Sequence, residues 1–339
     1  ESNQSTGQSS ISQTLTNTTN AVQTVVYTVT PTSGDAGNCV GTNFTVTVTV
    51  NPIATIANKT ASTCSGSGFT VTPTNGTDIV PSGTTYAWSS LPVVTGGLTG
   101  GATASLQSSI NGTLTNPTNT PQTATYTVTP TSGTCVGPTF NVVATINPKP
   151  VIVNKTSTIC SGDAFSVTPV NGSDIVPAST TYTWTTPISN PLGAITGGTS
   201  QATGLATISQ TLTNTSNTVQ TVVYTVTPKS GAAGACVGST FTITVTVNPR
   251  PTIDAISNQA VCAGSTVSGV TITGSVVSTV YTWANNTTSI GLGASGTGNI
   301  TSFTGTNVTN IPVVATVTVT PTYTNNSVAC VGSTSTFTI

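Results

Sequence analysis

Cysteines are the side chains of this sequence best suited to chemistry, and they recur in two contexts. One class has the context C-[SA]-G and the other mostly CVG: Cys64, Cys160 and Cys262, then Cys39, Cys135, Cys236 and Cys330. A zinc site usually needs closely spaced cysteines or histidines, and the chain has no His and no C-x-x-C pair. The pattern therefore predicts disulfides rather than a metal site, and an oxidising, extracellular location.

Two acidic and two basic residues also recur at matching places. Asp78 and Asp174 lie in NGTDIVP and NGSDIVP, and Lys59 and Lys155 lie in NKT. Calcium needs six to eight oxygen ligands, generally including several carboxylates, and no second acid lies nearby. We therefore expect each Asp to cap a turn. The lysines invite comparison with those of intramolecular isopeptide bonds, but we expect solvated lysines at strand ends.

The remaining composition argues against catalysis. The chain has 5 Lys+Arg, 6 Asp+Glu and no His, so only 3% of its residues are charged. Without such groups, general acid–base catalysis has few candidates and the many Ser and Thr hydroxyls lack an activating base. We predict no catalytic residue, no cofactor and no metal, and we expect the chain not to be an enzyme. The net charge of −1 also disfavours nucleic acid as a partner, and no apolar stretch is long enough to span a membrane.

Alternating β-branched and apolar residues predict β-strands. In FTVTVTVNP, Phe44, Val46, Val48 and Val50 share one face while threonines occupy the other, and the same pattern returns from Phe241 to Val247. One face is expected to pack in a core and the other to face water. Thr and Val favour strands, so we predict an all-β chain.

The strands belong to repeats of about 98 residues. Residues 11–52 return at 208–249 with about 34 of 42 positions identical. Each unit ends in Asn-Pro, which stiffens the connection to the next unit. We predict half a repeat, two whole repeats and one truncated in its last strand, numbered first to fourth: 1–51, 52–148, 149–249 and 250–339. The chain is then expected to be a fragment of a longer repetitive protein.

Two disulfide schemes fit this repeat pattern. The favoured scheme pairs the two classes within each repeat, and leaves Cys39 for a cysteine upstream of the fragment: Cys64–Cys135, Cys160–Cys236 and Cys262–Cys330. It closes loops of about 70 residues, which in the entropic description is worth about 4 kcal/mol each. The rival scheme pairs across the linkers: Cys39–Cys64, Cys135–Cys160 and Cys236–Cys262. Spacing alone leaves both open.

About seven short strands per repeat, with one Trp between two cysteines, are typical of an immunoglobulin-like β-sandwich. One Trp at a fixed place in a strand is expected to lie in the core rather than to form a sugar-binding platform. The predicted core aromatics are Trp88, Trp184, Trp283, Tyr27, Tyr126 and Tyr224.

The Y-x-W segments (Tyr86 to Trp88, Tyr182 to Trp184, Tyr281 to Trp283) and the endings YTVTP and FxVxVxVNP resemble PKD-like repeats. These are Ig-like modules of giant bacterial surface adhesins. With its cysteines and Thr richness, the chain looks most like the repeats of adhesins that gliding bacteria export by the type IX route. The resemblance implies tandem Ig-like (PKD-like) β-sandwich domains in an elongated array on a bacterial cell surface.

The resulting functional hypothesis is a non-catalytic stalk segment of a large extracellular adhesin or filament. The alternative is a set of carbohydrate-binding or spacer modules of a secreted enzyme that degrades polysaccharides. Expected partners are neighbouring repeats of the same chain. Because the edge strands have almost no charge to protect them, like chains in a filament or surface polysaccharide are further candidates, with short or bulged edges as the alternative.

Overall fold

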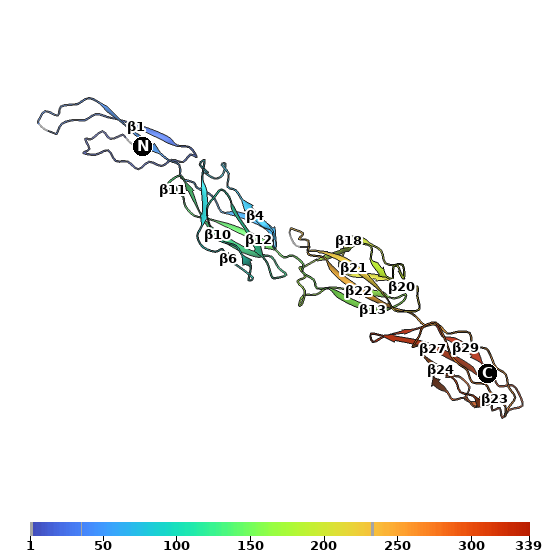
Figure 1. Cartoon of the computed structure of the whole chain (residues 1–339). Helices are drawn as coiled ribbons and strands as arrows, with labels where there is room; N and C mark the ends of the chain where they lie inside the picture. The colour runs from blue at the N-terminus through green and yellow to red at the C-terminus, as the bar shows by residue number, and fades with distance from the viewer. Residues whose placement is uncertain (1–2, 35, 232–233) are drawn as a thin grey trace. The chain divides into compact units, whose positions relative to one another are not determined.

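The computed structural model describes residues 3–34, 36–231 and 234–339. The chain divides into two compact units, Glu1–Lys149 with Gly231–Cys236, and Pro150–Ser230 with Val237–Ile339. Apart from one short 3-10 helix, η1 (Thr288–Ile290), the regular structure of the described residues consists of strands. The chain is all-β and its strands form several β-sandwich sheets, as predicted (Figure 1). No helix of the described residues is long and apolar enough to cross a membrane.

The first repeat contributes one antiparallel hairpin, β1 (Gln23–Val29) with β2 (Phe44–Val50). In the second repeat, a larger sheet contains β3 (Lys59–Cys64), β12 (Phe140–Asn147), β10 (Gln122–Ser132), β5 (Thr85–Trp88) and β8 (Ala104–Gln107) in that order, with β6 (Val93–Val94) and β11 (Cys135–Val136) also paired to β10. A smaller sheet contains β4 (Gly68–Val71), β9 (Ile110–Thr115) and β7 (Thr99–Gly100) in that order.

The third repeat has the same strand order as the second. Its larger sheet contains β13 (Lys155–Cys160), β22 (Phe241–Asn248), β21 (Gln220–Lys229), β15 (Thr181–Trp184) and β18 (Gln201–Leu205), with β16 (Ile188–Asn190) also paired to β21. Two short pairs accompany it, β14 (Ala164–Val167) with β19 (Ile208–Thr211) and β17 (Ile195–Thr196) with β20 (Thr213–Asn214). In both repeats the first strand of the order pairs in parallel with its neighbour.

The fourth repeat has a simpler sheet. It contains β25 (Ser295–Thr297), β24 (Val280–Asn285), β27 (Thr316–Asn325) and β28 (Val328–Val331), with β29 (Ser335–Thr338) also paired to β27. A second pair is β23 (Thr266–Val267) with β26 (Phe303–Thr304).

The alternating residues form the cores. In β22, Phe241 and Ile243 are buried while Thr242 between them is half-buried, because successive side chains of a strand point to opposite faces. The related strand β2 shows the same alternation at lower burial, with Val46 half-buried. Among the residues that the structure describes, buried apolar side chains form three separate clusters, within residues 54–146, 152–247 and 270–337.

The predicted core aromatics differ in burial. Trp88 and Trp184 are buried, and each indole N–H donates to a backbone carbonyl, of Ala102 and Thr199 respectively. Tyr126 and Tyr224 are also buried, and each ring lies edge-on or tilted against its Trp and a Phe. Trp283 and Tyr27 are only half-buried.

Candidate functional site

The cysteines pair between repeats and not within them. The structure contains Cys64–Cys236 and Cys160–Cys330, with Cα–Cα distances of 5.6 and 5.4 Å. The predicted pairs Cys64–Cys135, Cys160–Cys236 and Cys262–Cys330 are therefore wrong, and so is the scheme that pairs cysteines across the linkers. Among the described residues, Cys39, Cys135 and Cys262 make no disulfide. Each observed bond joins the C-S-G cysteine of one repeat to the CVG cysteine of the next.

The strand register explains why pairing within a repeat fails. Cys64 ends β3 opposite Asn147, at the end of the sheet where the chain leaves the second repeat. Cys135 lies opposite Ser132, at the other end of β10. Gln122 and Ser132 mark the two ends of β10, which is about 33 Å long at the usual rise per residue. A disulfide needs Cα atoms within about 7 Å, so the two classes cannot meet inside one sandwich.

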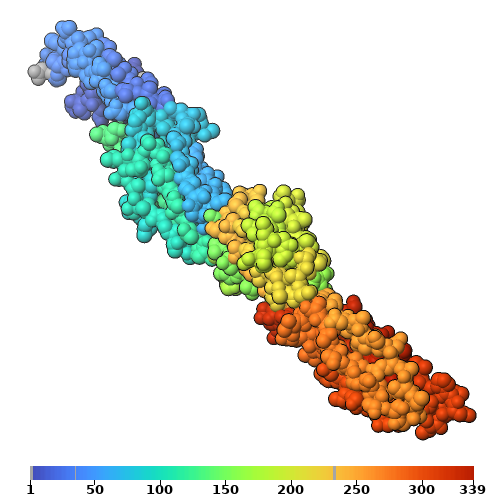
Figure 2. Space-filling model, turned by 45° about the vertical axis from the view of Figure 1, so that its right-hand side comes forward, coloured from blue at the N-terminus to red at the C-terminus, as the bar shows by residue number. Residues whose placement is uncertain are grey.

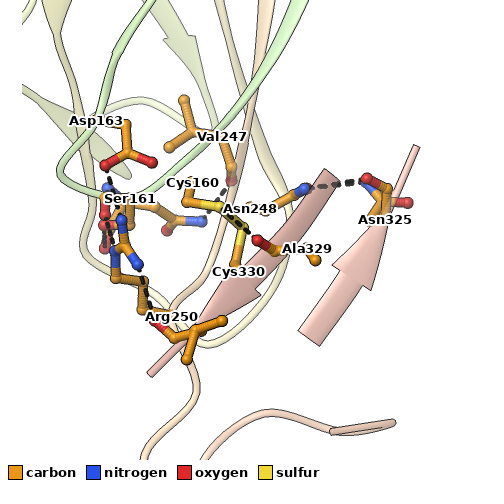
Figure 3. The surroundings of a disulfide bond; sticks show 11 residues. Cys160, Ser161, Asp163, Val247, Asn248, Arg250, Asn325, Ala329 and Cys330 are labelled. Carbon is orange, nitrogen blue, oxygen red and sulfur yellow. Dashed lines mark hydrogen bonds and ion pairs between the residues drawn. A yellow bond between two sulfur atoms is a disulfide. The ribbon is translucent and has the colours of Figure 1, made fainter. Parts of the chain in front are cut away.

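The junction of the third and fourth repeats lies entirely within the second unit, and Figure 3 shows its disulfide. Cys160 ends β13 and begins a tight turn, in which Asp163 N–H donates to the Cys160 carbonyl at 3.0 Å. Ser161 N–H donates to Asn248 and Gly162 N–H to Leu212, both at 2.8 Å. These bonds attach the turn to the end of β22 and to Leu212, the residue between β19 and β20, so the Cys160 sulfur is presented at the end of the sandwich.

The partner, Cys330, is fully buried on β28. β28 forms a hairpin with β27, and Cys330 lies opposite Tyr323. Asn326 and Ser327 form the turn of this hairpin with positive φ angles of 48° and 62°. The hairpin therefore holds the CVG cysteine of the fourth repeat rigidly against the turn of the third.

Arg250 in the linker NPRP clamps the same junction. Its Nε donates to the Ser161 carbonyl at 2.7 Å, and a terminal nitrogen donates to the Val331 carbonyl at 2.8 Å. Its other terminal nitrogen pairs with the Asp163 carboxylate at 2.7 Å (Figure 3). Both charged side chains are about half exposed, so the ion pair itself contributes little to stability. The contacts of Arg250 matter more for geometry than for stability, because this one side chain joins the linker to both the third and the fourth repeat.

Two asparagines form a second contact across this junction. Asn248 Nδ2 donates to the Asn325 carbonyl at 3.2 Å, and Asn325 Nδ2 donates to Asn248 Oδ1 at 2.9 Å. Asn248 is completely buried, so its amide needs these partners. In the space-filling view, the yellow-green surface of the third repeat meets the orange and red surface of the fourth (Figure 2).

The glycine of three of the four CVG segments, those of the second, third and fourth repeats, allows the linker to pack directly on the following repeat. A Cβ on Gly137, Gly238 or Gly332 would lie within 1.8–2.3 Å of a linker carbonyl oxygen, of Ala54, Pro150 and Pro251 respectively. No Cβ fits at such distances. The Gly of the motif is therefore required because backbone meets backbone there.

The recurring lysines and aspartates form ion pairs whose carboxylates are buried, an arrangement that the sequence did not lead us to expect. Lys59 Nζ lies 2.5 Å from Asp78 Oδ2, and Lys155 Nζ lies 2.7 Å from Asp174 Oδ2. The carboxylates are only 2% and 1% exposed, and the other oxygen of each accepts a backbone N–H, of Ala57 and Val153. The predictions of turn-capping Asp and solvated Lys were therefore wrong. The sequence did contain one indication of the pairing: the Lys and the Asp are both present in the second and third repeats and both absent from the fourth.

A metal site has no support in the described part of the chain, which contains no group of three or more His, Cys, Asp or Glu side chains that could hold an ion. A hollow of about 450 Å³ lies in the fourth repeat beside Cys262. The junction of the third and fourth repeats is therefore the candidate functional site. Its chemistry is covalent and structural: a disulfide, an arginine clamp and a paired amide.

Comparisons with known proteins agree with this architecture. The profile of the PKD-like domain family matches residues 1–54, 56–150 and 157–251, together more than half of the chain. No curated protein matches the chain.

Solved structures similar to this chain include three multi-domain segments. Mouse cadherin-23 EC22–24 is 13% identical with a TM-score of 0.28, covering 84% of this chain and 95% of that one. The chicken CNTN1 FN1–FN3 structure is 10% identical with a TM-score of 0.27, covering 81% and 94%. Protocadherin gamma B2 domains 1–5 are 11% identical with a TM-score of 0.23, covering 93% of this chain and 65% of that one.

Family membership rests on the profile match and not on these distant structural likenesses. Disulfides and PKD-like domains together indicate an extracellular protein. The only domain type that the profile comparison detects in the chain is non-catalytic. The chain belongs to the PKD-like domain family.

Proposed function

We propose that this chain is a load-bearing segment of an extracellular stalk, built from four consecutive repeats with boundaries at 1–51, 52–148, 149–249 and 250–339. The observation that carries the proposal is the interleaving of its two disulfides. Cys64–Cys236 spans 172 residues, Cys160–Cys330 spans 170, and the two spans overlap between Cys160 and Cys236. Successive repeats are therefore connected by sulfur as well as by the backbone.

Interleaving changes how the chain can extend under force. Tension that enters at Cys64 passes through sulfur to Cys236, continues to Cys160, and passes through sulfur again to Cys330. This path contains about 76 residues and reaches roughly 270 Å, whereas the backbone from Cys64 to Cys330 reaches roughly 900 Å when fully extended. Even when every repeat between Cys64 and Cys330 is unfolded, the intact disulfides would thus prevent most of the backbone from being stretched.

The clamp of the second unit supports the same role. Arg250 and Asn248 restrain the linker on both sides of the Cys160–Cys330 bond, and proline on either side of Arg250 limits backbone rotation. A stalk needs junctions that resist bending as well as breaking. Scarce charge makes such a shaft insensitive to salt.

The finer role is that of a bacterial surface adhesin of the gliding-motility type, exported by the type IX route. It is supported by the resemblance of the Y-x-W, CVG and FxVxVxVNP motifs to repeats of such adhesins. The full-length coding sequence tests this assignment. Many further repeats and an export domain would support it, whereas a catalytic domain for polysaccharides would replace it with the carbohydrate-binding alternative.

Single-molecule stretching between the two ends of the chain tests the mechanical proposal. In oxidised protein we expect the distance between Cys64 and Cys330 to reach no more than roughly 270 Å under force, and after reduction to reach roughly 900 Å. The matched control is Cys64→Ser with Cys236→Ser, which leaves only the second bond. Oxidised wild-type chain that extends as far as reduced chain would contradict the proposal.

Lateral partners remain a separate proposal. The edge strands β8 and β18 are short, and a bulge or irregularity interrupts their pairing with β5 and β15. Bulged edges resist pairing with another chain, which favours self-protection over lateral assembly. Sedimentation of unglycosylated protein tests this: monomers at high concentration would exclude assembly through the edges, and concentration-dependent association would support a filament of like chains.

A further inference from the structure

Cys262 in the fourth repeat lies in a turn of the same kind as the turns that carry Cys64 and Cys160, the two cysteines that form disulfides. Ser265 N–H donates to the Cys262 carbonyl at 3.0 Å, as Ser67 does to Cys64 and Asp163 to Cys160 at 2.9 and 3.0 Å. The glycine two residues after each cysteine donates its N–H to a carbonyl of a distant segment at 2.8 Å: Gly66 to Leu114, Gly162 to Leu212 and Gly264 to Gly305. The backbone that presents the sulfur is thus the same in all three repeats.

Cys262 lies at the end of its repeat towards which the last strand runs, as Cys64 and Cys160 do in their repeats. In the third repeat, β22 runs in parallel with β13 and reaches Asn248 opposite Cys160. In the fourth, Gln259 N–H donates to the Thr338 carbonyl, and Thr338 N–H donates to Asn258 Oδ1. Asn58 and Asn154 make this same contact with the last strand of their own repeats. The last strand therefore runs towards the end that carries Cys262.

Cys262 differs from Cys64 and Cys160 in that no other repeat covers its side chain in the described part of the chain. Cys160 is buried against its partner hairpin, whereas the Cys262 side chain is exposed and makes no disulfide within the described residues. Beside it is the hollow of about 450 Å³, lined by apolar side chains that include Val261, Val313 and Val314. Val261 and Val314 are 42% and 62% exposed. Cys262 therefore combines the turn of the two bonded cysteines with an exposed sulfur.

We propose that Cys262 is the disulfide acceptor for the CVG hairpin of a further PKD-like repeat placed directly after the fourth. The bond forms by exchange with an oxidised thiol carrier such as glutathione disulfide: two protein thiols become one disulfide, and one carrier disulfide becomes two thiols. Electrons and protons balance in this exchange. The same rule assigns Cys39 and Cys135, which lie in CVG segments, to turn cysteines of preceding repeats.

A chain lengthened by one repeat tests the proposal. Phe337-Thr338-Ile339 corresponds to Phe241-Thr242-Ile243, so residues 1–339 followed by a second copy of residues 244–339 continue the last strand in register. After refolding with reduced and oxidised glutathione, peptide mapping without reduction should recover Cys262 bonded to the Cys330 of the appended copy. Recovery of Cys64–Cys236 and Cys160–Cys330 from the same sample shows that the array has folded.

Two matched variants complete the design. Cys330→Ser in the appended copy alone should leave Cys262 free to react with iodoacetamide, and Cys262→Ser should leave the appended Cys330 free. The proposal is overturned if Cys262 of the lengthened chain reacts fully with iodoacetamide while the other two bonds are present. It is also overturned if Cys262 is recovered bonded to Cys39 or Cys135.

Discussion

Gly332 packs against the carbonyl oxygen of Pro251, and a Cβ at this glycine would lie 1.8 Å from that oxygen. The contact joins the linker to the hairpin that carries Cys330, two residues away. The path of the linker backbone and the position of the Cys160–Cys330 disulfide therefore depend on each other. A substitution at Gly332 should disturb this junction and leave the apolar core of the fourth repeat unchanged.

Gly332→Ala is expected to displace the linker, slow the formation of Cys160–Cys330 and lower the stability of the fourth repeat by about 1–3 kcal/mol, the usual cost of overpacking. Gly293→Ala in the same repeat is the matched control, because its nearest neighbouring atom lies 4.0 Å away. Refolding followed by thiol counting and urea melts measures both effects. Equal behaviour of the two variants would show that the close approach is unimportant.

Cleavage of the backbone after Lys229 is expected to leave the array in one piece. Lys229 is exposed, and both disulfides span it. Limited trypsin treatment should give two fragments on a reducing gel and a single band on a non-reducing gel. The variant with both Cys64→Ser and Cys160→Ser should separate without reductant. Separation of the wild-type fragments without reductant would refute the interleaved pairing.

Asp174→Asn is expected to destabilise the third repeat by about 3 kcal/mol, because it leaves the Lys155 ammonium without its buried counter-charge. Adding Lys155→Met should recover part of the loss. Asp163→Asn serves as the control, since this exposed carboxylate should cost less than about 1 kcal/mol. Urea unfolding followed by Trp fluorescence reports the comparison. A similar cost for both aspartates would mean that the buried pair has no special role.

Tyr224→Phe and Tyr126→Phe are expected to differ although the two tyrosines occupy equivalent places. The Tyr224 hydroxyl donates to Gln210 Oε1 at 2.9 Å, whereas the Tyr126 hydroxyl has no partner among the described residues. Gly112 occupies the position that Gln210 holds in the third repeat. Losing the paired hydroxyl should cost about 1 kcal/mol, and losing the unpaired one should be neutral or stabilising. Thermal melts of both variants check the difference, and equal losses would argue against it.

Stability is expected to fall in alkali and to change little between roughly pH 5 and 9, where the chain has no His to titrate. Burial, assisted by the negative charge of Asp174, raises the pKa of Tyr182 to about 12, and burial also raises the pKa of Tyr224. Below pH 10 these tyrosines are protonated in both the folded and the unfolded chain. Above it the unfolded chain loses protons first, so stability falls by about 2 kcal/mol for Tyr182 by pH 12.

Urea melts between pH 5 and 12 measure this profile, and Tyr182→Phe should reduce its alkaline slope. Flat stability up to pH 12 would show that the buried tyrosines do not resist ionisation. A large change between pH 5 and 9 would instead reveal an ionisable group whose titration is coupled to folding.

The all-β fold could be predicted because alternation is a local property. Residues such as Phe241 and Ile243 repeat with period two, and a strand of that pattern must turn one face to a core. The two cysteine classes were also visible in the sequence. The Lys59–Asp78 pair was visible only as two residues that recur together, because nothing local brings side chains 19 positions apart into contact.

By itself, then, the sequence determined the strands, the repeat length and the chemical class of each cysteine. The tertiary structure alone decided which cysteines meet. Cys64 and Cys135 belong to one repeat, yet the parallel pairing of β3 with β12 puts Cys64 at the end where the chain leaves and the β10–β11 hairpin puts Cys135 at the opposite end. Separation along the chain carries no information about the end of a sandwich at which a residue lies, and a disulfide forms only between sulfurs that the fold brings together.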